Sequence, residues 1–85
     1  MASADTKRVG KGSHMVSHYS MLIQWSEEDG AYVVSFPEFP SSHTHGATYE
    51  EAAQNGREVL DLLAETYATE GRPLPEPASF LYAPV

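Results

Sequence analysis

The sequence contains no cysteine, few basic residues and no long hydrophobic run. Without cysteine, the chain has neither disulfides nor thiol chemistry. No stretch approaches the roughly 20 apolar residues needed to cross a bilayer, and no signal-peptide pattern is visible, so we expect a cytoplasmic protein. Its 85 residues suffice for one small domain. A single core stabilises a domain of that size by only a few kcal/mol, and oligomerisation often adds the remainder.

Basic residues become scarcest after the first fourteen positions. The run from Gly12 to Met15 resembles the remnant of an expression vector, so we expect 1–14 to be a leader and 15–85 to be a single domain. The leader has one acidic and three basic residues, a net charge of +2; because the whole chain carries −7, residues 15–85 carry −9. Such a surface repels nucleic-acid phosphates and acidic lipid and attracts basic partners, although acidity also keeps a small protein in solution.

The most regular pattern in the sequence runs from Thr48 to Gly71 and predicts a long helix. Thr48 and Glu51 have the spacing of a capping box, in which the hydroxyl accepts a helix amide and the carboxylate returns to the N–H of Thr48 itself. Gly71 provides a left-handed stop, and the prolines after it prevent the helix from resuming. Gly56, inside the helix, indicates close approach to a sheet. Small or apolar residues recur at helical spacing at positions 52, 53, 56, 59, 60, 63 and 67.

Before this helix the pattern changes to a period of two. Residues 19–25 and 31–36 alternate along their length, and the acidic Asp-Gly turn between them predicts an antiparallel hairpin. We expect a short third strand at 42–47 and, beyond a proline-rich linker, a final strand at 79–82. The predicted fold is therefore α+β with the order β-β-β-α-β, a small, mainly antiparallel sheet with one long helix on one face.

One helix leaves the opposite face of the predicted sheet uncovered. That face carries Leu22 and Val33 among polar residues, so it is half apolar. We therefore expect self-association to a dimer or tetramer.

No constellation typical of an active site is present. The chain has neither a nucleophile elbow nor a phosphate-binding glycine loop, so we predict no catalytic residue, no cofactor and no enzyme activity. His43 and His45 lie at a spacing that suits zinc, nickel or copper, but no third ligand has a recognisable spacing, and exposed strand histidines are the simpler interpretation. The acidic turn at 27–29 lacks the ligand spacing of a calcium loop. We therefore predict no metal site.

Three motifs in a fixed order resemble those of a known family. They are Gly30-x-Tyr32-x-x-x-Phe36-Pro37-Glu38-x-Pro40, then Thr44-x-Gly46-x-Thr48-x-Glu50-Glu51-Ala52 with Asn55, then Gly71-Arg72-x-x-Pro75-x-Pro77. The combination, which extends from Tyr19 to about Ser79, resembles the HicB-type antitoxin family. The loop after the family's second strand usually resembles Phe-Pro-Asp-Leu-Pro-Gly-Cys; here it reads Phe36-Pro-Glu-Phe-Pro-Ser-Ser42.

This resemblance implies a partial ribonuclease-H-like fold without that enzyme's catalytic acids. It also implies a bacterial antitoxin that neutralises a small, basic, RNA-cleaving toxin of the HicA type. Many family members add a DNA-binding domain; this sequence ends at Val85 without one, so we expect a stand-alone form or a shortened chain, and no direct nucleic-acid binding. Two rival hypotheses remain: a stand-alone oligomeric HicB-like domain with a regulatory or unknown partner role, and an enzyme or metal protein built on His43 and His45.

We place the predicted toxin contact at the hairpin and the proline loop. Aromatic residues usually contribute most of the binding energy of an interface, and carboxylates complement a basic partner. The acidic residues of the helix, Glu58, Asp61 and Glu65, would then steer the encounter. The alternative is that the aromatic residues belong to the core. The predicted contact residues are Trp25, Glu27, Glu28, Asp29, Tyr32, Glu38 and Phe39.

Overall fold

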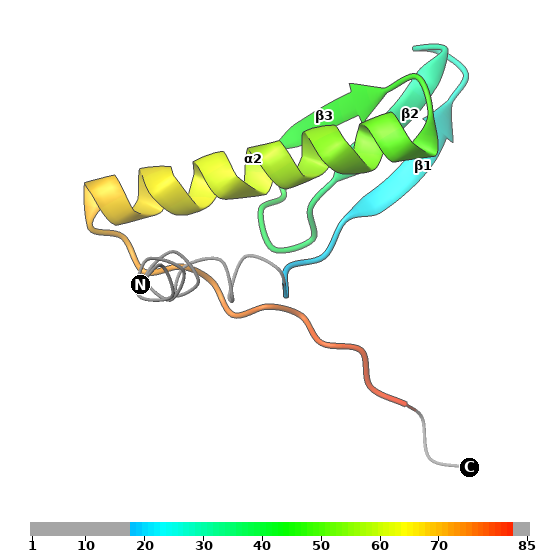
Figure 1. Cartoon of the computed structure of the whole chain (residues 1–85). Coiled ribbons are helices and arrows are strands. Elements are labelled where there is room, and N and C mark those ends of the chain that lie inside the picture. Colours follow the sequence, from blue (N-terminus) through cyan, green and yellow to red (C-terminus); the bar gives the residue numbers. More distant parts are fainter. Residues whose placement is uncertain (1–17, 83–85) are drawn as a thin grey trace, which may run out of the picture.

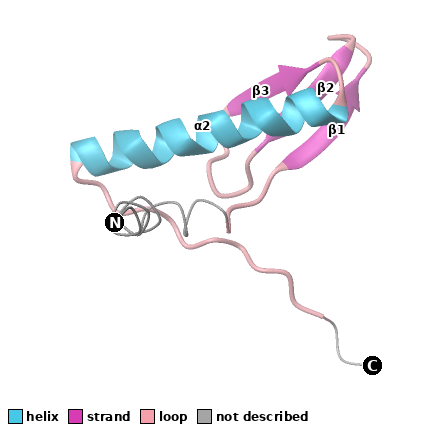
Figure 2. Ribbon diagram, viewed as in Figure 1, coloured by secondary structure: helices cyan, strands magenta, loops and turns pink. Residues whose placement is uncertain are grey.

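The computed structural model describes residues 18–82, so the predicted leader at 1–14 and the start of the predicted domain lie outside the described residues. The three strands form one antiparallel sheet in the order β1-β2-β3, and the helix lies across one face of it (Figures 1 and 2). The predicted α+β class is confirmed. The elements are β1 (Leu22–Ser26), β2 (Ala31–Ser35), β3 (His43–Gly46) and α2 (Tyr49–Glu70).

The predicted hairpin and third strand are both confirmed. In the hairpin, Trp25 of β1 lies opposite Tyr32 of β2, and the turn is closed by a 2.8 Å hydrogen bond from the Gly30 N–H to the Ser26 carbonyl. On the other side of β2, Tyr32 lies opposite Gly46 of β3. Because side chains alternate along each strand, this register places Val34 toward the helix and Val33 on the opposite, helix-free face.

Helix α2 begins and ends where the sequence predicts. The Thr48 Oγ1 accepts the Glu51 N–H at 3.0 Å, which confirms the cap. The Glu51 carboxylate, however, accepts the N–H of Ala47 at 2.7 Å instead of the predicted Thr48 N–H, because Thr48 has extended backbone angles that bring the preceding amide to the first turn. At the other end, Gly71 has a left-handed φ of 69°, and the N–H groups that follow return to carbonyls of the last turn.

The outward side of α2 is polar, as its pattern predicts. Glu58, Asp61 and Glu65 are exposed, and Gln54 donates to the Glu58 carboxylate at 3.2 Å. In residues 18–82, no helix has both the length and the apolar character needed to cross a membrane.

The core lies between α2, the helix-facing side of the sheet and the proline loop after β2. Gly56 allows the helix to approach closely: a Cβ at this position would lie 2.5 Å from the Met21 Sδ and 3.2 Å from a Val34 methyl. The predicted role of Gly56 is therefore confirmed. Leu63 and Tyr67 extend the contact toward the end of the helix. The buried core residues are Tyr19, Val34, Phe36, Phe39, Ala52 and Leu60.

The predicted final strand at 79–82 is wrong for the single chain. Within residues 18–82, no strand follows α2, and the chain after Ala78 leaves the body of the protein (Figure 1). A strand requires a neighbouring strand for its backbone hydrogen bonds. The linker is held against the segment before β1 and then turns away from the sheet. Residues 79–82 therefore have the composition of a strand, but none of the strands that the structure describes lies beside them.

Candidate partner-binding surface

Three aromatic rings form a row from the hairpin to the start of α2. The Trp25 and Tyr32 rings meet edge to face with 5.1 Å between centroids, and the Tyr32 and Tyr49 rings are tilted by 31° with 4.3 Å between centroids. The two outer residues are open to solvent: Trp25 is 50% exposed and Tyr49 is 58% exposed. The row therefore has an accessible aromatic surface supported by a half-buried central ring.

The local fold explains why these three rings meet. Trp25 and Tyr32 are directly opposite in an antiparallel pair, where side chains lie close enough to interact. Gly46, the next residue across the sheet, carries no side chain. Only two residues separate Gly46 from the first helical residue, Tyr49, so the helix begins beside Tyr32.

Three carboxylates lie at the hairpin tip, and one of them, Glu27, contacts this row. Glu27 accepts a hydrogen bond from the Trp25 indole N–H at 3.0 Å, and this bond holds the carboxylate beside the ring. Asp29 accepts from the Ser26 hydroxyl at 3.0 Å and thereby stiffens the tip. Glu28 is exposed. We call the hairpin surface the contacting group Trp25, Glu27, Tyr32 and Tyr49 together with the adjoining tip residues Glu28 and Asp29.

The other two predicted contact residues lie elsewhere. Phe39 is 5% exposed and packs edge to face against Tyr19 and Tyr67, with centroid distances of 5.0 and 5.6 Å. Its side chain belongs to the core, which was the alternative interpretation of the aromatic residues. Glu38, beside it, faces the segment before β1 and the linker after α2. The structure therefore brings Trp25, Glu27 and Tyr32 into contact and leaves Glu38 and Phe39 elsewhere. Glu28 and Asp29 belong to the adjoining turn, where Asp29 lies toward the helix-free face.

Glu38 connects three parts of the chain through its carboxylate. One oxygen accepts the Ser20 N–H at 3.0 Å; the other accepts the Ser20 hydroxyl at 3.0 Å and the Ala78 N–H at 2.7 Å. Burial would raise the pKa of Glu38, but the hydrogen bonds from Ala78 and Ser20 outweigh burial and lower the pKa below its ordinary value. Glu38 is thus an anion held by internal donors.

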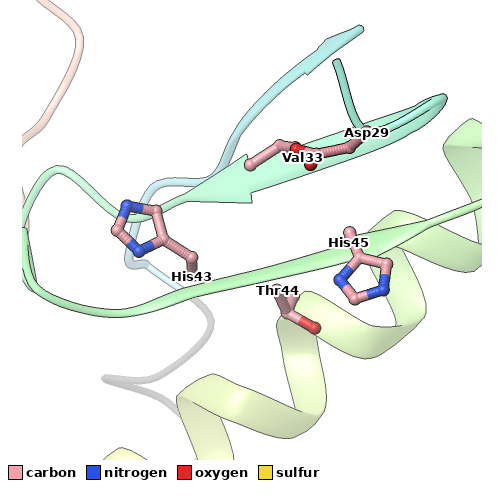
Figure 3. A pocket seen from close by; sticks show the side chains of 5 residues that line it. All are labelled: Asp29, Val33, His43, Thr44 and His45. Carbon is pink, nitrogen blue, oxygen red and sulfur yellow. The ribbon is translucent and has the colours of Figure 1, made fainter. Parts of the chain in front are cut away.

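The two histidines lie on the helix-free face of the sheet. Both are exposed, and with Val33, Thr44 and Asp29 they line an open depression of about 430 Å³. Figure 3 shows the two rings apart from one another along β3. Residues 18–82 contain no group of three or more histidine, cysteine, aspartate or glutamate side chains placed to hold a metal ion.

Tyr49 is the member of the hairpin surface that sequence reasoning missed. The predicted cap involves Thr48 and Glu51 and gives the ring of Tyr49, which lies between them, no role. The available signal was its spacing from Gly46: a strand ending opposite Tyr32 and a helix beginning within three residues must place the first helical side chain near that ring.

Together, the fold and this surface define a small α+β module with an exposed aromatic row beside an acidic hairpin tip. Residues 18–82 match the family described as the HicB-like antitoxin of bacterial toxin-antitoxin systems, and the chain belongs to that family. This confirms the resemblance carried by the three motifs. The family indicates an antitoxin role, and hence a toxin as partner and a non-enzymatic activity.

Two curated relatives support this membership. A UPF0150 protein of Synechocystis is 34% identical over 61 residues, which cover 72% of this chain and 76% of the relative. A UPF0150 protein of Thermotoga maritima is 35% identical over 52 residues, which cover 61% and 69% respectively. No solved structure matches the chain significantly.

Proposed function

We propose that this chain neutralises a small, basic, RNA-cleaving toxin of the HicA type by direct protein contact. It does so without catalysis, cofactor or metal, and acts in the cytoplasm, where the RNA is. The observation that carries the proposal is the hairpin surface, in which exposed aromatic rings and carboxylates lie together on a member of an antitoxin family.

The negative net charge of the chain supports a basic, RNA-binding partner. A protein that binds RNA must present basic side chains to the phosphates. Residues 15–85 carry −9, so the chain complements such a surface and competes with RNA for it. Glu58, Asp61 and Glu65 on the exposed side of α2 extend the negative field that steers the toxin toward the hairpin. For the same reason, this chain does not itself bind nucleic acid.

The two exposed rings supply the binding energy. Tyrosine and tryptophan are over-represented among the residues that dominate interface energetics, because each buries a large area for little loss of side-chain entropy. Tyr32 holds both outer rings in place from within the row. Glu38 and Phe39 contribute indirectly by fixing the proline loop, since their side chains are engaged within the chain.

A second function is favoured by one observation. The helix-free face and the segment after Ala78 expose apolar side chains, among them Leu22 at 49%. These side chains favour a homo-oligomer, a dimer or a tetramer. Such an oligomer is compatible with an antitoxin, but it also fits the second function, a stand-alone HicB-like domain with a purely regulatory role.

Co-expression distinguishes the two functions. A short, basic protein encoded beside this chain should arrest growth when induced alone and lose that effect when the full chain is produced with it. The double variant Trp25→Ala, Tyr49→Ala should fail to protect, whereas the control Leu62→Ala, which removes an exposed apolar side chain from α2, should protect fully. Protection by the double variant at equal protein level would remove the hairpin surface from the proposal, and a harmless neighbour would favour the regulatory function.

A further inference from the structure

The end of the described chain is an exposed apolar segment. Phe80, Leu81 and Tyr82 are 77%, 84% and 88% exposed. The Phe80 and Tyr82 rings pack edge to face, with 4.7 Å between their centroids. From position 77 to position 85 no side chain is charged. Apolar residues gathered in this way mark an interaction site more often than isolated ones do. We call residues 79–82 the tail.

The tail starts from a fixed point. In the linker before it, the Tyr19 hydroxyl donates to the Pro75 carbonyl at 2.5 Å, and Leu74 packs against the core. The Ala78 N–H donates to Glu38, which also binds Ser20. The chain is therefore fixed in place as far as Ala78, which lies beside the segment that leads into β1. The position and direction in which the tail begins are therefore fixed.

The sheet offers a free edge near that place. In the order β1-β2-β3, one side of β1 pairs with β2 and the other side has no neighbouring strand in residues 18–82. Unpaired edge N–H and C=O groups are a template for another strand. Leu22, at the start of β1, is 49% exposed and would gain an apolar neighbour from an added strand.

We propose that the tail of one copy adds to the free edge of β1 in a second copy, and that the exchange is reciprocal. In its own chain the tail runs away from the sheet (Figure 1). A reciprocal exchange about a twofold axis closes the assembly at a dimer and pairs both edges. The uncharged tail reaches a partner of the same negative charge without adding repulsion. Residues 79–82, which have the composition of a strand, then form that strand in the sheet of the second copy.

The first test compares the mass of the full chain with that of matched variants. Light scattering at high micromolar concentration should give twice the 9.3 kDa chain mass. The double variant Phe80→Glu, Tyr82→Glu should be a monomer with an unchanged circular-dichroism spectrum. Leu62→Glu adds a carboxylate to another exposed apolar position and should remain a dimer. A monomeric wild type, or a double variant that still dimerises, would overturn the proposal.

The absence of cysteine permits a second test that separates exchange from docking within one chain. The double variant Gln24→Cys, Leu81→Cys is produced in two versions of the chain that differ in length. The two versions are mixed, unfolded, refolded together and oxidised. A disulfide between the long and the short chain is expected, and should form at least ten times faster than with Leu62→Cys in place of Gln24→Cys. If the double-cysteine chain instead closes an internal disulfide and stays a monomer, the exchange is refuted. Neither readout involves a toxin, so this inference and the proposed function fail independently.

Discussion

Glu38 and Ala78 are separated by 40 positions in the sequence, yet the Ala78 N–H donates to the Glu38 carboxylate at 2.7 Å. The same carboxylate binds the N–H and the hydroxyl of Ser20. One side chain thus holds the proline loop, the entry to β1 and the linker after α2 together. Because these hydrogen bonds favour the ionised carboxylate, they lower the pKa of Glu38 in the folded protein and make its stability depend on pH.

We predict that stability falls in acid through Glu38. Because its pKa is lowered on folding, the contribution is present above the unfolded value of about 4.5 and is lost as the pH falls through the folded pKa. Glu38→Gln should lose roughly 1 kcal/mol of unfolding free energy at pH 7 and flatten the decline below pH 4.5. Urea titrations at several pH values measure both. Identical acid sensitivity in Glu38→Gln would contradict the prediction.

Leu60 is predicted to be the most sensitive apolar position of α2. It is 3% exposed in the contact with the sheet, so Leu60→Ala should lower the free energy of unfolding by ~2–5 kcal/mol. Leu62, two positions further along, is 60% exposed, and Leu62→Ala should stay within about 0.5 kcal/mol of wild type. Equal effects at the two positions, measured by urea unfolding, would show that the helix presents a different side to the sheet.

Gly56 is predicted to tolerate a methyl group and no more. In Gly56→Ala, the new Cβ meets the flexible end of Met21, which can move, and the better helix propensity of alanine offsets the crowding at Val34. In Gly56→Leu, the larger side chain must displace β2 itself, at a cost of roughly 1–3 kcal/mol. Thermal melts of the pair should therefore differ clearly, and a leucine variant as stable as the alanine variant would exclude a tight helix–sheet contact.

The hairpin surface should lose affinity when either outer ring is removed. Trp25→Ala and Tyr49→Ala should each weaken binding to the purified toxin by about 30-fold, the effect expected for a ring that contributes roughly 2 kcal/mol. Calorimetric titration measures this directly. Binding within threefold of wild type in both variants, with Leu62→Ala as the reference, would mean that the toxin binds elsewhere.

Charge at the hairpin tip should act mainly on the association rate. Glu28→Lys should slow association several-fold at low salt, and the difference from wild type should shrink at physiological ionic strength, where charges are screened beyond ~8 Å. Glu76→Lys makes the same change of charge in the linker and serves as the control. Stopped-flow kinetics at a series of salt concentrations measure both rates; equal slopes for the two variants would argue against steering by the tip.

Much of the fold could be predicted from the sequence because its determinants are local. The hairpin follows from two alternating segments and an Asp-Gly turn, and α2 follows from the Thr48 cap, its apolar spacing and the Gly71 stop. The same alternation correctly placed Val33 on the face that the helix leaves uncovered. Each of these features depends on residues within one turn or one strand pair of each other.

The roles of individual side chains at the site were harder to predict, because they depend on distant neighbours. Trp25 and Phe39 are both aromatic residues beside carboxylates, and nothing in their local sequence distinguishes them. Tertiary packing places Phe39 between Tyr19 and Tyr67 and leaves Trp25 half exposed at the end of the sheet. Tyr49 joined the site only because β3 and α2 meet at a particular distance.

The sequence by itself determined the class of fold, the order of its first four elements, its negative charge and its family. Only the tertiary structure decided which of those charges are available. Glu28 lies in solvent, whereas Glu38 is occupied by donors 18 and 40 positions away. It also decided that, within residues 18–82, no strand lies beside residues 79–82. The reason is physical: helix caps and turns are satisfied by near neighbours, while a carboxylate's partners and a strand's neighbour are supplied by the whole folded chain.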